Sequence, residues 1–138
     1  MTTRYLLDTN IVSVPISTRP IAAVVEKLRK HGEECAIAAP IWHELEYGCE
    51  RMPYGRRRAA LAEYLTKVVR PAFPILPYDD AAATRHAIER ARLERAGTPS
   101  PFVDGQIAAI AQVRGLILVT RNIRDFARYE DLQVEDWT

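Results

Sequence analysis

The chain has 138 residues, the usual size of one domain, and 48% of them are hydrophobic, so it can bury an ordinary core without disulfides or a structural metal. Its 19 basic and 18 acidic side chains nearly cancel, which argues against binding nucleic acid through overall charge but leaves room for a local basic patch. Cys35 and Cys49 lack metal-ligand spacing and are expected to be reduced thiols. No apolar run is long enough to cross a bilayer, so we expect a soluble cytoplasmic protein.

Short apolar runs alternate with helical patterns through the first half of the chain. The first run ends at Asp8, and Thr9 and Asn10 after it are typical residues for the start of a helix. Pro15 and Pro20 bracket a loop. The expected elements are strands over 5–7 and 35–39, helices over 21–31 and from 40 to about 48, and a turn over 52–55.

The second half repeats this alternation. Prolines flank the apolar run over 74–77 and favour a short strand near an edge of the sheet. The expected elements are helices over 56–69, from Asp79 or Asp80 to 96 and over 102–113, a clear strand over 116–119, a helical turn holding Asp125, and a weak strand over 132–134. Strands separated by helices imply βαβ units. We therefore expect one α/β domain over 1–138, with three α/β/α layers and a central parallel sheet.

Several acidic and polar residues fall where strands end. In open parallel sheets, ligands bind at the carboxyl ends of the strands. Asp8 ends the first strand, whereas Thr120 and Asn122 end the clearest later strand, with Asp125 one short turn beyond. Two further acids stand early in helices, Glu44 after the second strand and Asp104 after a proline-rich loop.

Crowded carboxylates repel one another unless a cation neutralises them, and a set of oxygen ligands selects Mg²⁺ or Mn²⁺ rather than Zn²⁺. A bound ion of this kind lowers the pKa of a water molecule and stabilises charge on a phosphoryl oxygen. The pattern thus predicts a nuclease that uses Asp8, Glu44, Asp104 and Asp125. Taken singly, each acid also has an ordinary interpretation as a cap, a partner of the helix dipole or a solvated residue.

Five motifs, in this order and at these separations, resemble those of a known family. They are LLDTNIVS at 6–13, ELEYG at 44–48, FVDGQIAAIA at 102–111, LVTRNIRDF at 118–126 and VEDW at 134–137. The sequence from Arg4 to Trp137 resembles a PIN-domain ribonuclease, and specifically a VapC-type toxin of type II bacterial toxin–antitoxin systems. The resemblance implies a PIN fold and an endoribonuclease that depends on Mg²⁺, with Mn²⁺ as a substitute.

The resemblance also assigns roles to individual residues. Asp8 and Asp104 match the family's metal-binding acids, Glu44 rather than Glu46 matches the acid of the second motif, and Asp125 matches the most variable acid. The matching residues that support the site are Thr9, Asn10, Thr120 and Asn122. The implied partners are an RNA substrate, a cognate VapB-type antitoxin that inhibits the toxin, and a second copy of the chain, with no membrane.

Some interpretations remain open at this point. Arg121 and Arg124 adjoin the expected site and are candidates for contacts with RNA, whereas Arg56, Arg57 and Arg58 form either a solvated helix start or a phosphate contact. A PIN domain that binds RNA or protein without cutting is the main alternative function. A phosphatase with a nucleophilic aspartate is a remote one, because Asn10 stands where such an enzyme needs a second Asp.

Overall fold

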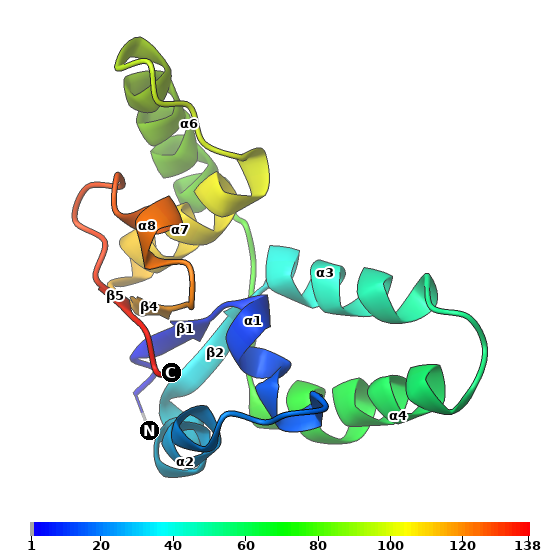
Figure 1. The fold of residues 1–138 in the computed structure, drawn as a ribbon. Coiled ribbons are helices and arrows are strands. Elements are labelled where there is room, and N and C mark those ends of the chain that lie inside the picture. Colours follow the sequence, from blue (N-terminus) through cyan, green and yellow to red (C-terminus); the bar gives the residue numbers. More distant parts are fainter. Residues whose placement is uncertain (1) are drawn as a thin grey trace.

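The computed structural model describes residues 2–138, and its centre is a five-stranded sheet in which every pairing is parallel (Figure 1). The strand order is β3-β2-β1-β4-β5. The strands are β1 (Tyr5–Leu7), β2 (Cys35–Ala38), β3 (Ile75–Leu76), β4 (Ile117–Val119) and β5 (Val134–Glu135). The parallel sheet and its helical layers confirm the predicted α/β/α fold.

The register places the first strand at the centre of the sheet. Leu6 pairs with Ala36 of β2 on one side and with Leu118 of β4 on the other, and all three side chains are fully buried. Such continuous apolar runs are typical of strands covered on both faces. β3 lies at an edge of the sheet, as its flanking prolines predicted.

The first half of the chain contributes five α-helices and the turns between them. The helices are α1 (Thr9–Val12), α2 (Ala22–His31), α3 (Ala39–Glu50), α4 (Arg56–Tyr64) and α5 (Arg70–Ala72). A 3₁₀ turn η1 (Val14–Ile16) occupies part of the expected loop, a second one, η2 (Gly32–Glu34), follows α2, and a π-helical turn η3 (Leu65–Val69) joins α4 to α5.

Two helix ends differ from the prediction. Helix α3 continues past Gly48 to Glu50, because burial of Cys49 outweighs the cost of about 1 kcal/mol that a glycine imposes inside a helix. The helical run that begins at Arg56 continues beyond residue 69 to Ala72, where the N–H of buried Phe73 still donates to the Val69 carbonyl at 3.0 Å.

The second half supplies α6 (Asp80–Arg95), α7 (Phe102–Arg114) and α8 (Ile123–Phe126). Asp79 caps α6 by accepting a hydrogen bond from the Ala82 N–H at 3.0 Å. Gly115 ends α7 in the left-handed conformation, with φ at 65°, as its position after the helix predicted. The last strand begins two residues later and ends one residue later than the predicted 132–134, because only Val134 and Glu135 pair with β4.

Figure 1 shows α6, α7 and α8 on one side of the sheet, with α2 and α4 on the other. Helices α3 and α4 run side by side as an arm joined by the turn over 51–55. Helix α1 begins at the end of β1, so the carboxyl edge of the sheet lies between the arm and the α7–α8 layer. Among residues 2–138, no helix combines the length and the apolarity that crossing a membrane would need.

Candidate active site

The best-ordered acid of the predicted site is Asp8, which follows β1 and caps α1. Its side chain is 9% exposed. One carboxylate oxygen accepts a hydrogen bond from the Thr9 N–H at 2.8 Å, and the other accepts from the Thr120 hydroxyl at 2.7 Å. Burial raises the pKa of Asp8, the two hydrogen bonds oppose this effect, and the charge of Asp125 adds to it, so the pKa is raised overall.

The predicted supporting residues connect the ends of β1 and β4. Thr120 is fully buried, and its hydroxyl oxygen also accepts a hydrogen bond from the Asn122 N–H at 3.0 Å. Asn10 accepts from the Arg121 N–H at 3.2 Å through its side-chain oxygen. Thr120 lies 112 positions after Asp8, and Arg121 lies 111 positions after Asn10. The two hydrogen bonds therefore hold the ends of β1 and β4 together.

Asp104 and Asp125 stand close enough to Asp8 to share its electrostatic field. Asp104 lies in the first turn of α7 and is half-buried, whereas Asp125 lies on α8 and is exposed. Burial, followed by the negative charges of Asp8 and Asp125, raises the pKa of Asp104, and the positive charge of Arg128 acts in the opposite direction. Three of the four predicted acids therefore act on one another electrostatically.

Glu44 is the fourth predicted acid, and its charge is not among those that shift the pKa of Asp8 or Asp104. It lies on α3 with 45% of its side chain exposed and lines a shallow pocket together with Val103 and Gln106 of α7. Asp104 lies between Val103 and Gln106 in the sequence of α7 but does not line this pocket. His43 Nδ1 stands 3.8 Å from a Glu44 carboxylate oxygen.

The donors at this edge fit a hard divalent cation by their chemistry. All four predicted acids offer oxygen, and burial, with a smaller contribution from neighbouring carboxylates, raises the pKa of Asp8 and Asp104. Over residues 2–138, however, no group of three Asp, Glu, His or Cys side chains stands ready as a coordination cluster. The fit therefore rests on donor type and charge.

The arginines separate into different roles. Arg121 and Arg124, the predicted RNA contacts, are both exposed. Arg128 was not predicted, yet its charge acts on Asp104 and its guanidinium donates to the Thr98 carbonyl at 3.1 Å. Within the basic run, Arg58 donates to the Met52 carbonyl at 3.1 Å and pairs with Glu50 at 3.0 Å, so it fastens the turn between α3 and α4.

The PIN domain family model matches residues 5–132. The chain therefore belongs to the PIN-domain family, which confirms the family and the fold that its motifs predicted.

Within that family the chain is a VapC-type member. It is 37% identical over 135 residues to the tRNA(fMet)-specific endonuclease VapC of Shigella flexneri, and the match covers 98% of each chain. Its fold is similar to the crystal structure of FitAcB from Neisseria gonorrhoeae, with a TM-score of 0.86, 32% identity, and 94% and 95% of the two chains covered. It is also similar to DNA-bound VapBC from Salmonella typhimurium, with a TM-score of 0.85, 31% identity, and 99% and 100% covered.

Proposed function

We propose that this protein is an endoribonuclease toxin that depends on Mg²⁺ or Mn²⁺, cuts RNA phosphodiester bonds and is inhibited by a cognate VapB-type antitoxin. The observation that carries the proposal is the electrostatic influence of Asp8 and Asp125 on Asp104 in a VapC-type PIN fold. Homologues named as endonuclease and ribonuclease support the nuclease activity.

Each residue of the edge has a part that follows from its surroundings. Asp8 and Asp104 would hold the cation, with Glu44 and Asp125 completing the acidic shell. The ion, when bound, supplies a water of lowered pKa and neutralises charge on the phosphate. Thr120 fixes the orientation of the Asp8 carboxylate through its 2.7 Å hydrogen bond. Arg121 and Arg124, which are both exposed, would bind neighbouring phosphates of the RNA strand.

The direct test is cleavage of a purified RNA in the presence of Mg²⁺ and of EDTA. Because the Shigella relative is named for tRNA(fMet), that tRNA is the first substrate to offer, with a second tRNA as a control. We expect cleavage with Mg²⁺, none with EDTA, and none by Asp8→Asn. Cleavage that continues unchanged in EDTA or in Asp8→Asn would overturn the proposal.

The antitoxin and the second copy of the chain require surfaces away from this edge. A groove of about 550 Å³ lies between η1 and α4, and its lining includes Ile16, Met52, Ala60 and Leu61. An antitoxin segment could pack its apolar side chains there. We propose that the VapB-type antitoxin docks there and that two toxin copies pair. Co-purification of an antitoxin encoded beside this gene, lost on Leu61→Asp, would support the groove, and light scattering would measure the dimer.

A PIN domain that binds RNA without cutting it is the second candidate. In this alternative the acidic edge would hold no cation, and the exposed Arg121 and Arg124 would still contact phosphates. Wild-type protein that binds no Mn²⁺ at millimolar concentration, yet still shifts RNA on a gel, would establish it in place of the nuclease.

A further inference from the structure

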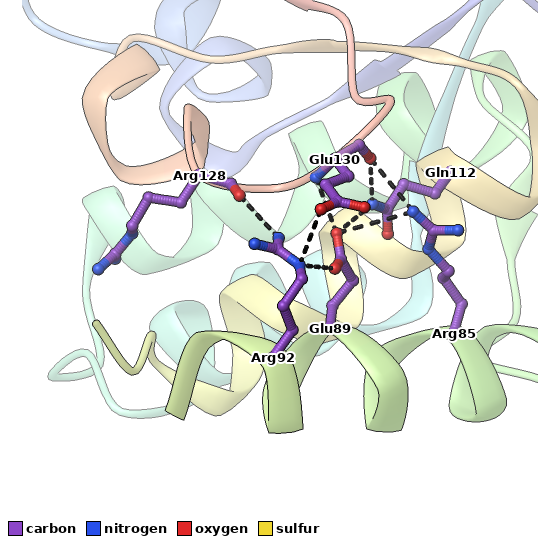
Figure 2. A network of polar contacts seen from close by, with 6 residues as sticks. All are labelled: Arg85, Glu89, Arg92, Gln112, Arg128 and Glu130. Carbon is purple, nitrogen blue, oxygen red and sulfur yellow. Dashed lines mark hydrogen bonds and ion pairs between the residues drawn. The ribbon is translucent and has the colours of Figure 1, made fainter. Parts of the chain in front are cut away.

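A buried carboxylate outside the candidate active site gathers a network of polar contacts, which Figure 2 shows. Glu89 lies on α6 and is only 2% exposed. Arg92 donates to one of its oxygens at 2.7 Å, and Gln112 of α7 donates to the other at 2.9 Å. Arg85 stands 3.7 Å from that second oxygen. Burial would raise the pKa of Glu89, but the hydrogen bonds from Arg92, Gln112 and the Glu130 N–H leave it lowered.

Hydrogen bonds of the network hold the backbone of residues 128–130, which follow α8. The Glu130 N–H donates to Glu89 at 2.8 Å, and the Glu130 carbonyl accepts from Gln112 at 2.6 Å. The Arg128 carbonyl accepts from Arg92 at 2.8 Å. Figure 2 shows these three contacts reaching from the two helices to one strip of chain. Residues 128–130 are thereby held at both ends by side chains of α6 and α7.

This strip connects the network to the acids. It begins two residues after Phe126, the last residue of α8, and α8 carries Asp125. From the strip, the Arg128 guanidinium reaches the Thr98 carbonyl at 3.1 Å, in the loop that leads to α7 and Asp104. The Tyr129 hydroxyl is hydrogen-bonded to Ser100 in the same loop. Residues 128–130 therefore link the Glu89 network to α8, which carries Asp125, and to the loop that leads to Asp104.

We infer that Glu89 is a positioning residue of the candidate active site, which holds residues 128–130 on α6 and α7 so that Asp125 and Arg128 stay beside Asp104. The inference rests on the proposed function. Buried ion pairs contribute little net stability compared with apolar packing, and the α6–α7 contact already has an extensive apolar core. The contacts of Glu89 add to this apolar packing an attachment for residues 128–130.

The test measures Mn²⁺ affinity by calorimetry and RNA cleavage across Mn²⁺ concentrations, well below the melting temperature of each variant. Glu89→Gln keeps the shape of the side chain, but it replaces the carboxylate oxygen that accepts from Arg92 with an amide NH₂ group, which cannot accept. We expect Mn²⁺ to bind about 10-fold more weakly, the lower end of the range for outer-shell partners, with cleavage recovering at saturating Mn²⁺ and an unchanged KM for RNA. Glu94→Gln is the matched control, because it removes an exposed ion pair with Arg90 on the same helix.

A second variant keeps the inference testable if Glu89→Gln folds poorly. Arg92→Lys keeps a positive charge beside Glu89 but loses the second arm that reaches the Arg128 carbonyl, so we expect the same direction of change. If both variants bind Mn²⁺ with wild-type affinity, this result would overturn the inference but not the proposed function, even if the melting temperatures of the variants fall. Wild-type protein that binds no Mn²⁺ would overturn the proposed function and this inference with it.

Discussion

Asp104 shows most clearly that negative charge at the site costs free energy of folding. Its pKa is raised, so the ionised carboxylate disfavours the folded state, and metal-free protein should lose stability as the pH rises through that pKa. Asp104→Asn removes the charge and should raise the melting temperature of metal-free protein at neutral pH, on a scale of about 4 °C per kcal/mol, while abolishing cleavage. A fall in melting temperature, measured by calorimetry without metal, would contradict this account of the site.

Glu44 and Glu46 form a natural pair for comparison, since they lie two residues apart on α3. Glu44 lines the pocket it shares with Val103 and Gln106, whereas Glu46 is absent from that lining. Glu44→Gln should lower kcat by at least about 10-fold, and Glu46→Gln should leave it within about two-fold. Single-turnover cleavage of the same RNA measures the cleavage rate constant of each variant. Equal losses in the two variants would show that the negative charge of α3 in general matters and that the pocket does not.

Not every functional residue could be identified from the sequence. Asp8 and Thr120 could be predicted, because each follows an apolar run that is long enough to indicate a strand end. Glu89 could not, because it looks like one more charge on a solvated helix, and its partners Gln112 and Glu130 lie 23 and 41 residues away. Arg128 was missed for the same reason.

At the scale of elements, the site depends on how closely α7 approaches α6. A Cβ added at Gly105, the neighbour of Asp104, would lie 2.3 Å from the His86 ring. That ring cannot turn away freely, because His86 is buried, its Nδ1 is 2.7 Å from the Tyr78 hydroxyl, and Phe102 packs against it edge to face. Gly105 therefore allows the helix that carries Asp104 to dock.

Gly105→Ala should destabilise the protein by about 1–3 kcal/mol and reduce cleavage, since α7 must shift to relieve the clash. Gly48→Ala on α3 is the matched control: a Cβ there meets nothing within 4 Å, so this variant should be stabilised by about 0.5–1 kcal/mol. Urea unfolding of both variants measures the two free energies. Equal stability of the two variants would show that the α6–α7 contact tolerates a Cβ.

The sequence was most informative about elements whose ends carry strong signals. Asp79 before α6 and Gly115 after α7 fixed those boundaries, because each residue satisfies a backbone requirement of the helix end. The end of α3 could not be predicted from Gly48, since burial of Cys49 is a tertiary effect. The extent of the last strand also depended on pairing with β4, which local composition does not encode.

At the scale of the whole molecule, the parallel sheet brings together acids that the sequence scatters over more than 110 residues. β1 and β4 lie side by side in the sheet, and their carboxyl ends carry Asp8 directly and Asp125 through α8. Asp104 lies in the first turn of α7, and Glu44 lies on α3 in the α3–α4 arm. The near-zero net charge is consistent with this arrangement. A few arginines at the edge would bind RNA, and the protein surface as a whole would not.

The central claim is that this edge holds a divalent cation, and a calorimetric titration of Mn²⁺ into metal-free protein tests it most directly. The wild type should show saturable binding, and Asp104→Asn, which keeps the shape of the side chain, should weaken that binding by at least about 10-fold. Wild-type protein without saturable binding, or Asp104→Asn with unchanged affinity, would contradict the claim.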